Sequence, residues 1–503
     1  MKHKKSGIPL ISLMLGAMLL AGCAAKPTET AAASSETAEA AAVQSAAPAD
    51  AVITLSGSTA QSDSAAVEVD GSVVTITAAG TYEITGTLDD GMIIVSAGDE
   101  DDVELVLNGA DITSGTSAAI YIADCDDAVI TLASGSENTL KNGGSFVAVD
   151  DKNIDAVIFS TEDLTLSGDG ALTVESPAGH GVVSKDDLTV ESGTYTITAS
   201  GHGMTGKDEV LFESGVFTIN AGKDGLHAEN DEDDTLGNLT ISGGEFTITA
   251  DDDGVHAGGN TVIAGGVVNI LKSYEGVEGR TITISGGEIS VVSSDDGLNA
   301  AGGNDQSGGF FSNPFDSDDS ASITITGGTL TVNAQGDGID SNGTITMTGG
   351  TVFVSGPTNS GNGALDYGIS AEISGGTIIA AGASGMAENF SSATNQGVML
   401  VSTGTQSAGS TVELTDESGS VLLSWQPDKA YECVVISTPD VQVGGTYTVT
   451  AGSSSQTVSM TSSVYGAGMG MGGMGGMGQP GQMGGQMPGG QMGGQPGQMP
   501  GRP

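Results

Sequence analysis

The stretches LTISGGEFTITADDDGVHA (239–257) and ITISGGEISVVSSDDGLNA (282–300) follow one plan, and this plan indicates the fold class. Each has a short alternating run, a Gly-containing bend, a second alternating run, an acidic turn and a short third run. Alternation with a period of two places Ile282, Ile284, Ile289 and Val291 on one face, and Ser and Thr on the other. The plan therefore predicts three short strands in each unit.

The unit recurs at a nearly constant spacing, which can be measured from the residue before the recurring glycine. Successive gaps in residue number are 22, 22, 29, 22, 21 and 41, and the two long gaps contain insertions at about 229–235 and at 302–320. Without these insertions the spacing is nearly uniform. The residues that define it are His180, His202, Asp224, Asp253, Glu275, Asp296 and Asp337.

This period predicts an all-β protein, a right-handed parallel β-helix (β-solenoid) with about 22 residues per coil. An antiparallel sandwich would need hairpin turns and would not keep one column of acids in register. A nonapeptide calcium β-roll has a different period.

The first residues indicate export. Lys2, Lys4 and Lys5 precede an apolar stretch over 8–21, which is shorter than the ~20 residues that span a bilayer. It ends in Leu-Ala-Gly-Cys at 20–23, which resembles the lipobox of bacterial lipoproteins and implies a lipid on Cys23. An ordinary secretory peptide with an incidental cysteine is the alternative. We expect a protein anchored to the outer face of the cell membrane by lipid alone, with no transmembrane helix in the mature chain.

Composition changes divide the chain into six segments. They are a lipoprotein signal peptide (1–22), the lipidated cysteine with a flexible tether (23–50), an N-terminal cap with early coils (51–160), the regular β-helix (161–395), a small C-terminal β module or cap (396–465), and a disordered Gly/Met/Gln/Pro tail (466–503).

The chain is strongly acidic, with 63 Asp and Glu against 13 Lys and Arg and a formal charge of −50. Such a charge argues against nucleic acid and anionic membrane surfaces as partners. It also calls for a screening cation, for which extracellular calcium suits carboxylate oxygens. Cys125 and Cys433 are far apart in sequence and predict no disulfide framework. Both are expected to be buried and unpaired.

The acidic column is the first candidate site. Equivalent residues of adjacent coils lie ~4.8 Å apart, and calcium–oxygen bonds measure ~2.3–2.6 Å, so two stacked carboxylates can hold one calcium ion. Ordinary Asp-Gly turn chemistry is the alternative, although a turn does not require Glu275. The candidate ligands are Asp224, Asp252, Asp253, Glu275, Glu278, Asp295, Asp296, Asp337 and Asp340.

Histidines and aromatic residues are the second candidates. His180 is predicted to stack on His202, and His227 on His256, as hydrogen-bonding ladders, as sugar contacts or as a sparse zinc or copper site. The sequence is poor in the aromatic faces that sugars prefer. The candidate carbohydrate contacts are Tyr274, Phe310, Phe311, Phe315, His227 and His256.

Several segments together resemble a family of bacterial carbohydrate-binding β-helix proteins related in fold to pectate lyases. They are TYEITGTLDDGMIIV (81–95), VELVLNGADITS (103–114), ENTL (137–140), HGVVSKDDLTVESGTYTI (180–197) and DGLHAENDEDD (224–234). The resemblance covers roughly 65–450 and implies a cell-surface, calcium-binding protein with cellulose or pectic polymers as ligands. It places the calcium ligands at Asp224, Asp252, Asp253, Asp295 and Asp296. The Phe-rich insertion and the tail do not match the pattern.

Three functions remain open. The first is a binding platform for a plant-type polysaccharide, in which calcium stiffens the coils and bridges to uronate carboxylates. The second is a calcium-dependent pectate-type lyase, for which Lys223, Lys272 and Arg280 are the candidate bases beside the acidic column. The alternative for these three residues is a role as counter-ions to neighbouring acids. The third is a structural surface adhesin. No nucleophile elbow, P-loop or paired-carboxylate glycosidase motif is present to indicate another enzyme.

Overall fold

The computed structural model describes residues 49–147, 149, 150, 152–300 and 317–466. The predictions for the signal peptide, Cys23, the tether and most of the tail, and those for Phe310, Phe311 and Phe315, lie outside the described residues. The regular elements of the described part are all β-strands. Within it, no helix has the length and apolarity needed to cross a membrane.

The first of three sheets has 13 strands, and its pairings are parallel except that between β3 and β4. Its strands are β3 (Val67–Asp70), β4 (Val73–Ile76), β6 (Met92–Ser96), β8 (Ile120–Asp124), β11 (Ala156–Ser160), β14 (His180–Ser184), β17 (Met204–Gly206), β20 (Leu226–Ala228), β23 (Val255–Ala257), β26 (Val277–Glu278), β29 (Leu298–Ala300), β32 (Ile339–Ser341) and β34 (Asp366–Tyr367).

The second sheet has 26 strands, most of them in two parallel rows that join at long strands such as β7 and β33; its antiparallel pairings involve β2 and β40. Its strands are β1 (Ala51–Gly57), β2 (Ala60–Gln61), β5 (Gly80–Leu88), β7 (Val103–Ser114), β9 (Asp127–Leu132), β10 (Glu137–Asn142), β12 (Asp163–Gly168), β13 (Ala171–Ser176), β15 (Leu188–Val190), β16 (Thr194–Ala199), β18 (Glu209–Phe212), β19 (Val216–Ala221), β21 (Asn238–Ile241), β22 (Glu245–Ala250), β24 (Asn260–Ile263), β25 (Val267–Ser273), β27 (Thr281–Ile284), β28 (Glu288–Ser293), β30 (Ser322–Ile325), β31 (Thr329–Ala334), β33 (Thr344–Ser355), β35 (Ser370–Gly382), β36 (Ser392–Ala393), β37 (Gly397–Gln406), β40 (Tyr431–Thr438) and β43 (Val464–Tyr465).

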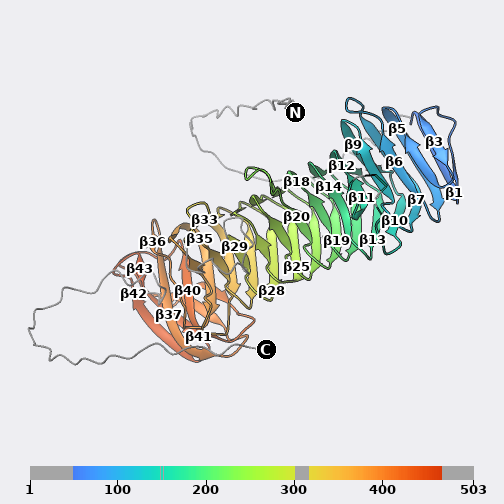
Figure 1. Cartoon of the computed structure of the whole chain (residues 1–503). Helices are drawn as coiled ribbons and strands as arrows, with labels where there is room; N and C mark the ends of the chain where they lie inside the picture. The colour runs from blue at the N-terminus through green and yellow to red at the C-terminus, as the bar shows by residue number, and fades with distance from the viewer. Residues whose placement is uncertain (1–48, 148, 151, 301–316, 467–503) are drawn as a thin grey trace, which may run out of the picture. The chain divides into compact units, whose positions relative to one another are not determined.

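A coil consists of three strands, one from the first sheet and one from each row of the second. Strands β14, β15 and β16 make one coil, and β17, β18 and β19 pair in parallel with them as the next. Tyr195 lies opposite Phe217, one period further along the chain. In Figure 1 the coils follow one another in sequence order, from blue to red. The predicted parallel β-helix is therefore confirmed.

The core lies inside the coils, because inward-facing apolar residues alternate with outward-facing polar ones. Strand β28 shows the pattern, with Ile289 and Val291 each 1% exposed. Aromatic rings stack along the interior: Tyr195 lies 5.3 Å from Phe217, and Phe217 lies 4.4 Å from Phe246, between ring centroids. Cys125 and Cys433 are buried and unpaired, as predicted.

The recurring glycine is required by the close approach of adjacent coils. The Gly276 N–H donates to the carbonyl of Asp296 in the next coil, at 3.0 Å. A Cβ at Gly276 would lie 2.3 Å from the carbonyl oxygen of Gly297, closer than real Cβ contacts. Glycine therefore follows the column residue for a steric reason, and this fixes the register of the column.

The C-terminal segment 396–465 partly continues the solenoid. Strand β40 pairs in antiparallel fashion with both β35 and β37 of the long sheet. Strand β43 pairs in parallel with β37 of the same sheet. Four other strands form a separate antiparallel sheet, β38 (Val412–Asp416), β39 (Val421–Trp425), β41 (Thr446–Ala451) and β42 (Ser454–Ser459). The Trp425 ring stacks on that of Phe353 of β33 at 5.2 Å, which docks this sheet on the last coils.

Candidate functional site

Two columns of side chains run from coil to coil along the solenoid, at the turn that precedes each strand of the first sheet. The first column consists of the residues that precede the recurring glycines. From Gly181 to Gly297, each of these glycines donates its N–H to the carbonyl of the column residue in the next coil, as in Gly225 to Asp253 at 2.9 Å. The second column lies three residues further along the chain. Its members are His227, His256, Glu278, Asn299, Asp340 and Asp366, aligned by the pairing of β20, β23, β26, β29, β32 and β34.

First-column side chains also form a ladder between coils. His180 Nδ1 accepts a hydrogen bond from the N–H of His202 at 3.0 Å, and Asp224 Oδ1 accepts one from the N–H of Asp253, also at 3.0 Å. Asp253 Oδ1 accepts a hydrogen bond from the N–H of Glu275 at 3.1 Å. The acceptor is His Nδ1 or Asp Oδ1, which lie at the same distance along their side chains, and this explains why Asp and His share the column. The sequence predicted hydrogen-bonding ladders for the histidines but not this role for the aspartates.

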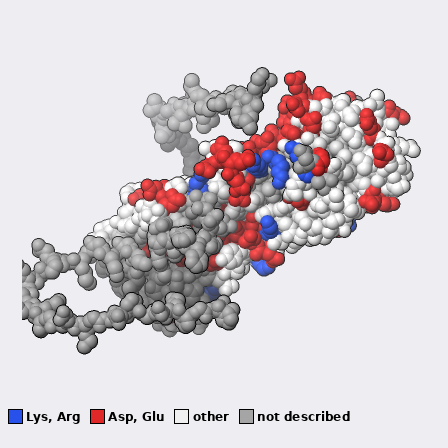
Figure 2. Space-filling model, viewed as in Figure 1, with Lys and Arg blue, Asp and Glu red and all other residues white. Residues whose placement is uncertain are grey.

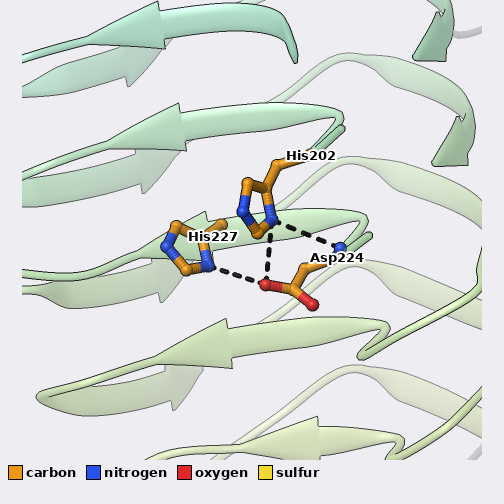
Figure 3. A group of neighbouring side chains, drawn as sticks. All are labelled: His202, Asp224 and His227. Atoms are coloured by element: carbon orange, nitrogen blue, oxygen red, sulfur yellow. Dashed lines mark hydrogen bonds and ion pairs between the residues drawn. The ribbon is translucent and has the colours of Figure 1, made fainter. Parts of the chain in front are cut away.

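One end of the two columns is rich in imidazole. Asp224 Oδ2 lies 3.0 Å from His202 Nδ1 and 2.7 Å from His227 Nδ1, so both rings point to a single carboxylate oxygen (Figure 3). The predicted stacking is present, with His180 4.8 Å from His202 and His227 5.0 Å from His256 between ring centroids. His202 also stacks on His227 at 4.0 Å, which joins the two columns.

The next coil repeats part of this arrangement. His256 Nδ1 lies 2.6 Å from Glu278 Oε2 and 3.3 Å from Asp253 Oδ2. Burial alone would lower the pKa of His256, but its bonds to Asp253 and Glu278 outweigh burial and raise it to about 11. Burial lowers the pKa of His180 to about 3. The bonds of His227 to Asp224 and Glu229 likewise outweigh burial and raise its pKa, so carboxylates favour the protonated form of His227 and His256, whereas burial disfavours it for His180.

The other end of the columns is rich in carboxylate. Asp296, Asp337 and Asp340 offer oxygen atoms within 4.8 Å of one another. Burial, reinforced by repulsion between neighbouring acids, raises the pKa of Asp296 to about 8, and burial raises that of Asp337 to about 7. The pKa of Asp340 is raised well above its usual value for the same reasons. Among the described residues, no ion pair to Lys or Arg neutralises this group.

Two residues that the sequence did not indicate complete the carboxylate end. Asp366 stands opposite Asp340 in β34, and its charge raises the pKa of Glu388, which burial and this repulsion bring to about 7. Glu388 Oε2 is buried without a hydrogen-bond partner. Neither residue precedes the recurring glycine, so only the pairing of coils could reveal them. The orphaned oxygen and the acidic donor set fit a hard cation such as calcium.

An exposed column runs immediately beside the first one. Tyr274 lies between Asp252 and Asp295, because its N–H donates to the Asp252 carbonyl at 2.7 Å and its carbonyl accepts from the Asp295 N–H at 2.9 Å. The Tyr274 side chain is 47% exposed, and a hydrogen bond to Asp295 raises the pKa of its phenol. Asp252 also joins Asp224 and Asp253 in a group of oxygen atoms within 4.8 Å. Acidic side chains gather in several patches on the face shown in Figure 2.

The remaining predicted residues are less suited to the roles expected of them. Lys272 Nζ forms an ion pair with Asp251 at 2.5 Å, and Arg280 donates to the backbone carbonyl of Asp234. The third candidate base, Lys223, is exposed. The side chains of His227 and His256 are only 12% and 9% exposed, which leaves little ring surface for a sugar.

A further acidic group lies at another turn of the coils and was not predicted. Asp163, Asp186 and Asp187 offer oxygen atoms within 4.8 Å of one another. Burial and the neighbouring acids raise the pKa of Asp186 to about 6 and that of Asp187 to about 7. The Asp-Asp pair before β15 is the sequence signal that could have identified it.

Comparison with known proteins points to a carbohydrate-binding family. Residues 70–319 match the family model described as "Carbohydrate-binding domain-containing protein". A protein of the same description from Acetivibrio thermocellus is 38% identical over 128 residues, which are 25% of this chain and 45% of that relative. The match thus spans less than half of the relative's length. The predicted resemblance to a carbohydrate-binding family is confirmed.

A solved structure is also similar to this chain. It is described as the polysaccharide lyase-like protein from C. thermocellum, in a gadolinium derivative. The two are 32% identical, the alignment covers 47% of this chain and 92% of the other, and the TM-score is 0.40.

Proposed function

We propose that this protein binds a polysaccharide along the exposed column of Asp252, Tyr274 and Asp295, starting from the match of residues 70–319 to a carbohydrate-binding family. The observation that carries the proposal is the exposure of Tyr274, an aromatic side chain set among hydrogen-bonding carboxylates inside the matched segment. An aromatic face packs against a sugar ring, and neighbouring carboxylates accept hydrogen bonds from its hydroxyl groups.

Calcium is the cation that we propose for the two columns. The carboxylates that would hold it are Asp296, Asp337 and Asp340, with Asp366 and Glu388 beside them, and a second group consists of Asp224, Asp252 and Asp253. Bound calcium would neutralise these buried charges and offer free coordination positions to a ligand oxygen. The orphaned Glu388 oxygen supports this assignment.

A plant-type polymer, either pectic or cellulosic, is the proposed ligand. Without a cation, the acidic columns would repel a polyuronate, so its binding should depend on calcium. Cellulose carries no charge, so its binding should be much less sensitive to calcium removal. We further propose, from the Leu-Ala-Gly-Cys motif at 20–23, that a lipid on Cys23 holds the protein at the cell surface.

Polygalacturonate affinity electrophoresis of the purified protein, with calcium and then with EDTA, tests the proposal. We expect retardation that requires calcium, and no ultraviolet-absorbing unsaturated product. Tyr274→Ala should weaken binding by about tenfold, the equivalent of one lost aromatic contact. Val421→Ala removes another exposed apolar side chain, 55% exposed on β39, and should leave binding unchanged.

Two results would redirect the conclusion. Steady formation of unsaturated product would identify a lyase, and Lys223, Lys272 and Arg280 would then be the residues to substitute. Equal affinity of the Tyr274→Ala variant and the unchanged protein for both polygalacturonate and cellulose would remove the exposed column as the binding surface.

A further inference from the structure

The histidines of this chain are concentrated in one place. The sequence contains five histidines, and four of them form the continuous stack His180, His202, His227 and His256. A ladder needs only acceptor atoms, which Asp supplies elsewhere in the same column. The hydrogen-bonding ladder therefore does not explain why the histidines are concentrated in these adjacent coils.

We propose that His202, Asp224 and His227 form a binding site for a transition-metal ion of the zinc class, separate from the calcium ligands of the carboxylate end. Three ligand atoms converge there from two adjacent coils: His202 Nδ1 and His227 Nδ1 lie 3.0 and 2.7 Å from Asp224 Oδ2. Figure 3 shows both rings directed at this oxygen.

The geometry is close to that of a metal-bound set. Zinc bonds to imidazole nitrogen and carboxylate oxygen measure ~2.0–2.2 Å, which in a tetrahedral site separates ligand atoms by roughly 3.3 Å. The two imidazole nitrogens, now 3.0 and 2.7 Å from Asp224 Oδ2, need to move away from this oxygen by a few tenths of an ångström to admit the ion. His202 Nδ1 would also have to give up the hydrogen bond that it accepts from the N–H of Asp224. At 3.3 Å this hydrogen bond is long.

The ligand types distinguish this position from the rest of the columns. Imidazole nitrogen suits zinc and its neighbours in the transition series, whereas calcium prefers oxygen. The following coil offers only one imidazole, His256, with the two carboxylates of Asp253 and Glu278. The three-ligand set at Asp224 therefore has the best composition for zinc among the described residues, with a fourth position left for water or a ligand.

Burial of the ligands favours a preformed site. The side chains of His202 and His227 are each 12% exposed, and that of Asp224 is 5% exposed. The rings are held by stacking at 4.0 Å, and Asp224 is held by the bond from the N–H of Asp253 to its Oδ1. Binding would thus require little ordering of side chains.

Zinc titration of the purified, metal-stripped protein tests the site. A chromophoric chelator would compete for zinc while calcium is kept in large excess, and cobalt would replace zinc to give a visible spectrum. We expect one zinc ion bound per chain, and a cobalt spectrum of low-symmetry, nitrogen-containing coordination. Both His202→Asn and His227→Asn should lower the affinity for zinc by at least about tenfold.

The variants are chosen to preserve the fold. Asparagine keeps an acceptor for the ladder at position 202, and the second column already carries asparagine at Asn299. His180→Asn is the matched control, because His180 belongs to the stack but not to the three-atom set, and it should retain zinc affinity. Should His202→Asn fail to fold, His227→Asn decides the outcome.

The zinc site shares Asp224 with the second proposed calcium group, but it shares no residue with the carboxylate end of the columns. Asp340→Asn should lower the affinity for calcium and leave the affinity for zinc unchanged. Failure of the calcium proposal can therefore be distinguished from failure of the zinc proposal. Absence of zinc binding in excess calcium would overturn the assignment. So would equal zinc affinity in the His227→Asn variant and the unchanged protein, and the stack would then be a hydrogen-bonding ladder alone.

Discussion

Replacing Asp296 by Asn should have opposite effects on stability without and with calcium. The carboxylate of Asp296 is held by burial and neighbouring acids at a pKa of about 8, against 3.8 for an ordinary Asp. Its Oδ1 accepts a hydrogen bond from the N–H of Asp337, and the amide oxygen of Asn can accept the same bond. The substitution therefore removes the titrating charge and keeps the ladder.

The magnitude follows from the pKa difference. An acid with a raised pKa keeps its proton in the folded state after the unfolded chain has lost it, so it destabilises the fold as pH rises above the unfolded value. Because pH 7 lies roughly three above the unfolded pKa, the cost is about 4 kcal/mol for Asp296 alone. Since neighbouring acids share part of this repulsion, we expect calcium-free Asp296→Asn to be about 2–4 kcal/mol more stable than the unchanged protein.

Urea unfolding at pH 7, in EDTA and in saturating calcium, measures both effects. In calcium the variant has lost a proposed ligand, so its calcium-induced stabilisation should shrink and the order of stability should reverse. Glu288→Gln is the control, since Glu288 is exposed on the same coil and its charge should matter little. Destabilisation of the variant in EDTA would show that Asp296 is not a source of repulsion. The same calcium response in both proteins would show that Asp296 is not a calcium ligand.

Three further results are expected. In EDTA the free energy of unfolding should fall as pH rises from 5.5 to 7.5, because Asp337 and Glu388 have pKa values of about 7 in the fold and lower ones in the unfolded chain; urea midpoints measure this, and a rise would contradict it. Phe217→Ala should cost about 3–5 kcal/mol in the same assay, whereas Val216→Ala, exposed in the same strand, should cost less than about 1 kcal/mol. Gly276→Ala should lower stability by about 1–3 kcal/mol, because its Cβ would meet the carbonyl of the next coil at 2.3 Å; an unchanged melting temperature would show that the coils can separate there.

The solenoid and the register of its columns could be predicted from the sequence. The reason is that the same unit repeats along the axis of the solenoid. Alternation within 282–300 identifies the inward face of each strand, and the regular period alone places Asp253 next to Glu275 of the adjacent coil. Glycine after each column residue marked the same register, because adjacent coils approach too closely there for a Cβ.

The contacts between side chains of different columns could not be predicted in this way and emerge from the three-dimensional fold. His202 and His227 belong to different columns and different coils, and the stacking of these two coils brings both Nδ1 atoms to one oxygen of Asp224. Glu388 joins the carboxylate end from a coil that lacks the repeat pattern. Burial likewise separates the neutral from the charged groups, because desolvation depends on everything packed around a side chain and is not encoded in its spacing.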